Sequence, residues 1–264
     1  MTIEDLAKRR SVRSYVPKPL LDSDRKTLEA LITDINTHEA GMHLQLFTDS
    51  GAPFEGFRRS YGMFRGVKNY VALVVDNSYP FMREKAGYYG EQIVMKAVEL
   101  GLGTCFVGGT FSSGHVDARV RAGEELLCLI VLGYADEAHT SLAARLSRKI
   151  AKRRSKKPED FFKSDISLLE AEKLFPALGQ GLEAVALAPS ALNKQPVEIG
   201  IASGSSEALN GSANSVLEDG VTVTATVPED NPMQLIDLGI AMFNFQAVVS
   251  GYWEWGLPAV FRAE

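Results

Sequence analysis

The pattern of apolar and polar residues predicts alternating helices and strands in the first part of the chain. Helices are expected over residues 4–10, 22–35 and 86–100, and Gly101-Leu102-Gly103 would end the last of them. Residues 43–47 alternate between apolar and polar, which predicts an outer strand, whereas residues 70–75 form an apolar run typical of a central strand. A second buried strand is expected over residues 126–132.

The same order of elements is predicted again after Pro158. Helices are expected over residues 168–174 and 181–187, strands over 197–202 and 221–226, and a last helix over 233–249. That last helix is apolar nearly all round, so we expect it to lie at the centre of its half. We therefore predict an α+β protein built by internal duplication, with halves over residues 1–157 and 158–264. The halves would interlock through their long apolar helices, as subunits of a dimer do.

Composition restricts the class of protein. The 264 residues exceed the roughly 100 to 200 expected of one domain, and 45% hydrophobic with 23% charged residues are typical of a folded globule. A net charge of −5 gives no electrostatic support for nucleic-acid binding. The chain has no charged leader followed by an apolar stretch and no run of about 18 apolar residues, so we expect a cytoplasmic protein without a membrane partner.

Thiols and imidazoles do not form a catalytic or metal-binding pattern in the sequence. Cys105 and Cys128 lie in apolar surroundings, which predicts buried structural thiols and excludes both a disulfide framework and a four-thiolate metal site. The four histidines are scattered without ligand spacing, so neither a zinc site nor a Ser/His/Asp triad can be assembled from them. We expect a bound cofactor to carry the chemistry.

Two short segments carry groups suited to a phosphate-bearing ring compound. Residues 9–13 place three guanidinium groups and a hydroxyl within one basic turn, which suits an oxyanion, although a solvated basic turn has the same composition. Residues 189–196, Pro-Ser-Ala-Leu-Asn-Lys-Gln-Pro, lie between a predicted helix and a predicted strand. Their side-chain amides and backbone groups suit the pyrimidine edge of a flavin, and an ordinary capped loop is the alternative.

Two further stretches are compatible with a ligand site. Gly108 and Gly109 would let a planar ligand lie against the backbone, or the stretch 101–111 simply ends a helix. Because that stretch lacks GxGxxG spacing, a Rossmann phosphate loop is disfavoured. Basic residues are concentrated between positions 145 and 157, where Arg154 and Lys156 could complete a phosphate site or belong to a solvated charged face.

Together these segments resemble the FMN-dependent nitroreductase family, and most closely its single-chain branch in which two half-units are fused. The resemblance implies FMN as the cofactor, NAD(P)H as the electron donor and a small-molecule acceptor such as a nitroaromatic or a quinone. It also implies hydride transfer through the flavin with ping-pong kinetics. No side chain would act as a nucleophile, and no metal is implied.

The resemblance further implies roles for individual residues. Arg9 and Ser11 would contact the FMN phosphate within the basic turn that Arg10 completes, and Arg13 would approach the N1/O2 edge, where its charge stabilises the anionic reduced flavin. The remaining implied contacts are Arg154 and Lys156 at the phosphate, Val107, Gly108 and Gly109 beside the reactive edge, and Pro189, Ser190, Asn193 and Gln195 at the ring.

Departures from the family pattern predict one site in place of two. Residues 36–43 stand where a second Pro-Ser-Ala-x-Asn segment would be needed, and the second half has no Arg-Arg-Ser-x-Arg turn. The fused halves would work as a pseudo-dimeric monomer or as a homodimer. Two other functions fit the same residues: a flavin carrier or flavin-modifying protein, and a degenerate scaffold that binds a phosphate-bearing ligand without turnover.

Overall fold

The chain forms two compact units. The computed structural model describes residues 1–264 except 56–61, 137, 140–154, 204–220 and 230. One unit comprises residues 7–154, and the other comprises residues 155–264 together with residues 1–6. A short helix, α1 (Ile3–Lys8), spans the sequence boundary between them.

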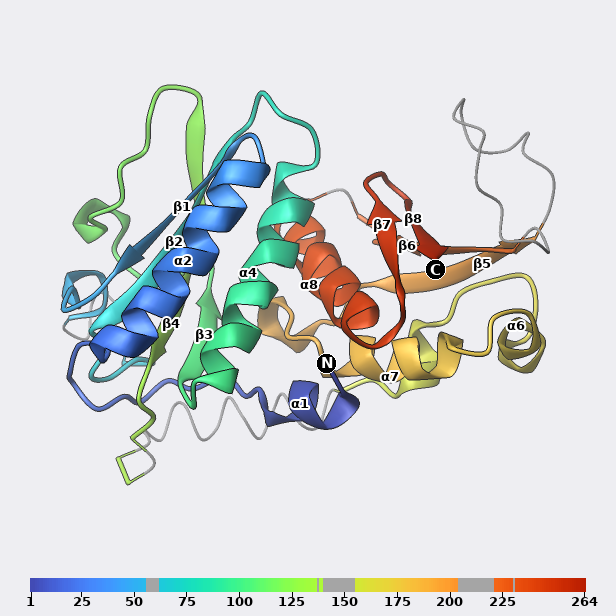
Figure 1. Ribbon diagram of the computed structural model, residues 1–264, viewed down its shortest axis with the longest axis horizontal. Helices are drawn as coiled ribbons and strands as arrows, with labels where there is room; N and C mark the ends of the chain where they lie inside the picture. The colour runs from blue at the N-terminus through green and yellow to red at the C-terminus, as the bar shows by residue number, and fades with distance from the viewer. Residues whose placement is uncertain (56–61, 137, 140–154, 204–220, 230) are drawn as a thin grey trace. The chain divides into compact units, whose positions relative to one another are not determined.

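The first unit is an antiparallel sheet of four strands with two long helices (Figure 1). Its elements are α2 (Asp22–His38), β1 (Met42–Phe47), β2 (Asn69–Asp76), α4 (Met82–Glu99), β3 (Gly103–Val107) and β4 (Glu124–Gly133). The strand order is β1-β2-β4-β3. The predicted outer and central strands are confirmed, because β1 lies at the edge and β2 lies between β1 and β4.

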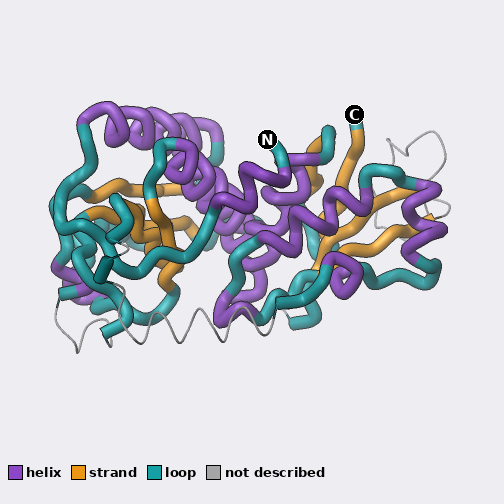
Figure 2. Tube along the Cα trace, turned by 90° about the horizontal axis from the view of Figure 1, so that it is seen from below, coloured by secondary structure: helices purple, strands orange, loops and turns teal. Residues whose placement is uncertain are grey.

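Both faces of this sheet are covered, which explains the unbroken apolar run of β2. Val71, Leu73 and Val75 pack in a core with α2 and α4, whereas Ala72 and Val74 pack in a second core on the opposite face. Figure 2 shows the strands between helices on one side and loops on the other. Since successive side chains of a strand point to opposite faces, a strand covered on both sides needs apolar residues throughout.

A glycine ends α4 and leads into a strand that the sequence analysis did not predict. Gly101 has a φ of 76° and donates its N–H to Val98, while Leu102 donates to Ala97, the paired hydrogen bonds of a Schellman cap. The helix stop is therefore confirmed. The stretch beyond it, where no strand was predicted, begins with β3.

The second unit contains another four-stranded antiparallel sheet (Figure 1). Its elements are the 3₁₀ helix η3 (Pro158–Phe161), α6 (Leu168–Leu174), α7 (Leu178–Leu187), η4 (Ala191–Asn193), β5 (Glu198–Ser203), β6 (Val221–Thr226), α8 (Pro232–Val248), β7 (Gly251–Glu254) and β8 (Ala259–Ala263). The strand order β5-β6-β8-β7 repeats that of the first unit, with each strand number raised by four. The predicted helices and strands of this part are present, whereas β7 and β8 were not predicted.

Helices α7 and α8 approach each other closely at a glycine. A Cβ added at Gly181 would lie 2.2 Å from Cε2 of Phe245. Phe245 in turn contacts Trp253 and Phe261 edge-on, with ring centroids 5.4 and 5.0 Å apart. Trp253 also donates its indole N–H to the carbonyl of Met242 at 2.9 Å. This aromatic cluster ties α8 to the sheet, so the predicted central position of α8 within its half is confirmed.

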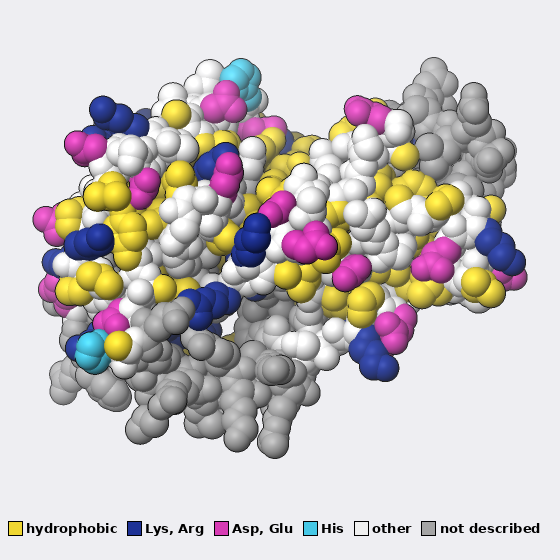
Figure 3. All heavy atoms as spheres, turned by 60° about the horizontal axis from the view of Figure 1, so that its bottom comes forward, with side chains coloured by type: hydrophobic (Ala, Val, Ile, Leu, Met, Phe, Trp, Pro, Cys, Tyr) yellow, Lys and Arg dark blue, Asp and Glu magenta, His cyan; other side chains and the backbone are white. Residues whose placement is uncertain are grey.

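The described surface carries charges of both signs. Figure 3 shows Lys and Arg side chains interspersed with Asp and Glu on the visible face. Some form exposed pairs, such as Arg25 with Glu29 at 2.8 Å, which contribute little to stability individually. Within the described residues, no helix has the length and apolar character needed to cross a bilayer.

The contact between α7 and α8 makes Gly181 sensitive to one added methyl group. We expect Gly181→Ala to lower the free energy of unfolding by about 1–3 kcal/mol, because the methyl group would overpack the contact with Phe245. Gly179→Ala is the matched control, since its Cβ would meet only the end of the Glu172 side chain, at 2.8 Å. This control should be neutral or stabilise by up to about 1 kcal/mol through helix propensity. Urea unfolding measures both, and equal effects would contradict the close packing.

Candidate functional site

In the first unit, the basic turn is fixed along strand β3. Ser11 pairs with Thr104 in a parallel bridge, and Val12 donates its N–H to the Thr104 carbonyl at 2.8 Å. The approach depends on Gly103, where a Cβ would lie 2.6 Å from Cγ2 of Val12. The basic turn therefore lies along β3, which ends at Val107. Val107 is the first of the three residues, 107–109, predicted to lie beside the reactive edge of the flavin.

The backbone that follows the turn is also held on its other side. Arg65 donates its N–H to the carbonyl of Arg13 at 3.0 Å, and Tyr15 donates its N–H to the carbonyl of Arg65 at 2.9 Å. The buried Tyr15 hydroxyl donates to the Val12 carbonyl at 2.6 Å. The backbone of the turn is thus hydrogen-bonded to Thr104 on one side and to Arg65 on the other. These bonds restrict the backbone that carries the partly exposed Arg13 side chain.

Cys105 lies under the basic turn as a buried free thiol. Burial raises the pKa of this thiol, although the positive charges of Arg13 and Arg9 and a hydrogen bond with Ser11 act in the opposite direction. A raised pKa leaves the thiol protonated and weakly nucleophilic at neutral pH. Cys128 is likewise buried and free. The prediction of two buried thiols is confirmed.

A buried carboxyl group that the sequence analysis did not select lies beside Arg9. Glu91 of α4 is fully buried, with its Oε1 atom 3.9 Å from Nε of Arg9. Within the described residues, neither Glu91 oxygen nor that Nε has a hydrogen-bond partner. Burial raises the pKa of Glu91 to about 8, even though the charge of Arg9 lowers it. Glu91 is therefore largely protonated at neutral pH and leaves the charge of Arg9 available to an anion.

The glycines after β3 have room for a ligand. Gly108 and Gly109 are exposed, and a Cβ added at Gly109 would have no described atom within 4 Å. The backbone at Gly109 does not have a positive φ, so neither sterics nor dihedral strain among the described residues requires glycine there. Arg10 is also exposed.

In the second unit, the predicted flavin segment is an unusual loop between α7 and β5. Leu192, Asn193 and Gln195 have φ values of 53°, 52° and 49°, which residues other than glycine rarely adopt. The Ser190 hydroxyl accepts the Gln195 N–H at 2.9 Å, and the Ser190 carbonyl accepts the Asn193 N–H at 3.0 Å. Pro189 precedes Ser190 and is partly exposed.

Lys156 and Gln195 connect this loop to the segment before η3. The Lys156 ammonium donates to the Gln195 carbonyl, and the Lys156 N–H donates to Oε1 of Gln195, both at 2.8 Å. Asn193 donates its side-chain amide to the Ser155 hydroxyl at 3.4 Å. The structure therefore brings together two predicted contact segments that are far apart in sequence. Arg154 and the basic residues that precede it lie outside the described residues.

The side chain of Gln195 is occupied by contacts within the protein. It is 4% exposed, its Nε2 donates to the Ala186 carbonyl at 3.2 Å, and its Oε1 accepts from Lys156. One amide group thus joins the end of α7, the loop and the segment before η3. In this arrangement Gln195 holds the loop and does not present its amide to a ligand.

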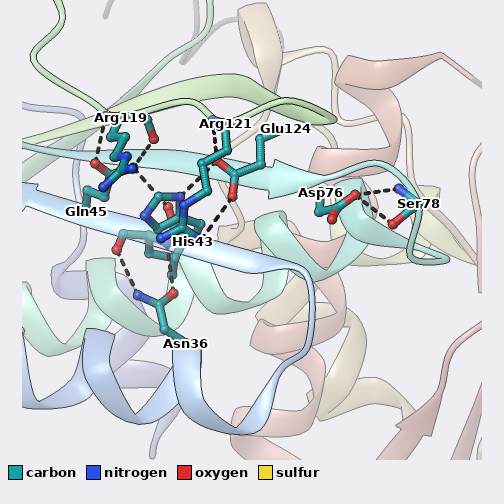
Figure 4. Close-up of polar contacts among 9 residues, drawn as sticks. Asn36, His43, Gln45, Asp76, Ser78, Arg119, Arg121 and Glu124 are labelled. Carbon is teal, nitrogen blue, oxygen red and sulfur yellow. Dashed lines mark hydrogen bonds and ion pairs between the residues drawn. The ribbon is translucent and has the colours of Figure 1, made fainter.

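The corresponding connection in the first unit is much shorter. Helix α2 ends at His38 and β1 begins at Met42, whereas residues 188–197 connect α7 to β5. Asn36 accepts the Leu44 N–H at 2.8 Å and donates to the Leu44 carbonyl at 2.9 Å, which joins α2 directly to β1 (Figure 4). His43 and Gln45 on the same strand bond to Glu124 and Arg119. This edge has no counterpart of the 189–196 loop.

The chain is similar in sequence and fold to known nitroreductases. Residues 1–249 match a family described as "Putative TM nitroreductase". A protein from Thermotoga maritima described as a putative nitroreductase has a similar structure, with a TM-score of 0.58 and 18% identity over 99% of this chain and 92% of that one. This likeness confirms the predicted α+β fold of nitroreductase type. Among curated proteins, no match was found.

Other solved structures match about half of the chain. An FMN-dependent nitroreductase from Clostridium difficile is 18% identical, with 53% of this chain and 91% of that one covered and a TM-score of 0.42. A nitroreductase with bound FMN from Bacteroides fragilis is 17% identical, with 52% and 89% covered and a TM-score of 0.41.

Buried Glu91 should make stability depend on pH. Its carboxyl ionises at its ordinary pKa of 4.5 in the unfolded chain and at about 8 in the fold, so its contribution to stability is lost as pH rises between these values. Relative to the unaltered chain, Glu91→Gln should gain stability across this window by up to about 1.4 kcal/mol per pH unit. Urea unfolding from about pH 5 to pH 8 measures this, with Glu125→Gln as a control whose side chain is 43% exposed. Parallel pH profiles for Glu91→Gln and the unaltered chain would contradict the buried ionisation.

Proposed function

The chain belongs to the nitroreductase family, a family of oxidoreductases, and from this membership we propose that it is an FMN-dependent enzyme that uses NAD(P)H to reduce a small-molecule acceptor. A nitroaromatic or a quinone fits the acceptor role, and turnover follows ping-pong kinetics. Bound FMN would supply the redox chemistry. The protein supplies binding, orientation and charge.

The observation that best supports this proposal is the fixed basic turn on β3. Three arginines and a serine lie on backbone that is hydrogen-bonded to Thr104, and the mostly protonated Glu91 does not cancel the charge of Arg9. An FMN phosphate carries about two negative charges at neutral pH, which guanidinium groups bind by bidentate hydrogen bonds.

The other residues assigned to FMN each have a chemical role. The exposed backbone at Gly108 and Gly109, directly after Val107, would admit the planar ring, and Ser190 and Asn193, next to Pro189, would offer polar groups to it. Lys156, Arg154 and Arg10 would contribute positive charge for the phosphate. Gln195 positions the loop through Ala186 and Lys156.

One site per chain follows from the contrast between the two units. Their shared strand order supports an internal duplication into halves at residues 1–157 and 158–264. Of the α2-to-β1 and α7-to-β5 connections, only the second is long enough to carry a flavin segment.

The first test is the amount of flavin that the chain retains. Purified protein, mixed with FMN and desalted, should retain one flavin per chain by absorbance, and NADH or NADPH should bleach it when oxygen is excluded. Two retained flavins would contradict the single site. Retained flavin that neither nucleotide reduces would indicate a flavin carrier, and no retained flavin would favour the scaffold function.

The second test removes one charge from the basic turn. We expect Arg13→Gln to weaken FMN binding by about 10- to 100-fold, the usual effect of losing a charged hydrogen-bond partner. Quenching of FMN fluorescence measures the dissociation constant. Arg25→Gln is the matched control because Arg25 pairs with Glu29 on the surface of α2. Equal affinities of both variants and the unaltered chain would contradict the role of Arg13.

A further inference from the structure

An acidic residue of α8 reaches the loop of residues 189–196. Asp237 is only 5% exposed, and its two carboxylate oxygens accept the Ala191 N–H at 2.9 and 3.2 Å. Ala191 lies between Ser190 and Leu192, at the start of the part of the loop with positive φ angles. The contact therefore joins the loop to a residue of α8 that lies 46 positions further along the chain.

The loop conformation must be held from outside. Each residue with a left-handed backbone costs of order 1–3 kcal/mol unless it is glycine. Leu192 is 85% exposed, so packing of its side chain does not offset this cost. The surrounding hydrogen bonds must do so: the bond between Ser190 and Gln195 lies within the loop, and Lys156 and Ala186 hold Gln195 near its end. Asp237 supplies a bond from the long helix, whose position is fixed by the aromatic cluster.

Burying the carboxyl group of Asp237 costs free energy of folding. Burial raises the pKa of Asp237 to about 7, although the Ala191 N–H and the charge of Lys194 lower it. Its contribution to stability is consequently lost as pH rises from its ordinary pKa of 3.8 toward 7. An aliphatic side chain would avoid this loss but would leave the Ala191 N–H without an acceptor.

We propose that Asp237 is a positioning residue for the flavin: by accepting the Ala191 N–H, it holds Ser190 and Asn193 in place for the FMN ring. The inference rests on the proposed function and adds a residue to it. Asp237 acts through the loop and does not touch the cofactor.

Three variants of the full-length chain separate positioning from general stability. Asp237→Leu removes the acceptor, and Asp237→Asn keeps a carbonyl oxygen that can accept the same N–H. Asn244→Leu is the matched control, because Asn244 is buried on the same helix and donates to the Ala184 carbonyl of α7 at 3.1 Å. FMN affinity by fluorescence quenching, urea unfolding, and amide hydrogen exchange of residues 189–196 without FMN are measured for each.

We expect Asp237→Leu to weaken FMN binding about 10-fold or more and to speed exchange in the loop. Asp237→Asn should bind FMN within about 3-fold of the unaltered chain, since the acceptor is restored. Asn244→Leu should lose stability and keep its FMN affinity. Unchanged affinity in Asp237→Leu, or an equal loss in Asn244→Leu, would overturn the inference.

Two further outcomes are distinguishable. If the unaltered chain does not bind FMN, the proposed function is wrong, and the exchange comparison still decides whether Asp237 holds the loop. Unchanged exchange in Asp237→Leu then overturns the inference on its own. If Asp237→Leu does not fold, Asp237→Ser replaces it, because the shorter side chain cannot reach the Ala191 N–H.

Discussion

The irregular backbone of this protein depends on hydrogen bonds from buried polar side chains. Backbone N–H and C=O groups that leave a helix or strand must still find partners, and an unpaired buried group costs as much as a lost hydrogen bond. Asn69 meets this need in the first unit, where it accepts the Leu20 N–H and donates to the Lys18 carbonyl. Gln195 does so for the Ala186 carbonyl and the Lys156 N–H. Asn69 lies on β2 and Gln195 bonds to the last turn of α7, so each amide joins a loop to a regular element.

This constraint explains how two units with one strand order carry different connections. Helix α2 and strand β1 are joined by residues 39–41, whereas residues 188–197 join α7 to β5. The short connection is satisfied at its own ends: Glu39 donates its N–H to the Ile35 carbonyl, and the Glu39 carbonyl accepts the Met42 N–H. The long connection has more backbone to satisfy, and it uses the Ser190 hydroxyl, the Gln195 amide and a carboxylate from α8. The regular elements set the scaffold, and the polar side chains determine what lies between them.

The same distinction sets the limit of prediction from sequence. Strand β2 and helix α8 were predictable because burial on all sides requires long apolar runs, and the glycine stop of α4 follows from its backbone conformation. Strands β3, β7 and β8 were not, since a strand of 4 or 5 residues offers too few positions for a periodic pattern. The segments that carry the candidate site were visible as motifs. The hydrogen bonds of Gln195 within the protein could not be predicted. An amide side chain looks the same in a sequence whether it binds a ligand or the protein backbone.

Two acids, Glu91 and Asp237, were also missed, and they share a signal that could have revealed them. Each is an ionisable residue in a long helix buried on most of its surface, α4 or α8, and these helices occupy the same place in the element order of the two units. Burial raises the pKa of both carboxyl groups toward neutrality, so the contribution of each to the stability of the fold decreases as pH rises. If these positions served packing alone, an aliphatic residue would stabilise the fold more. Glu91 lies beside the basic turn and Asp237 beside the loop, and in each unit the long helix therefore supports the segment that we assign to the cofactor.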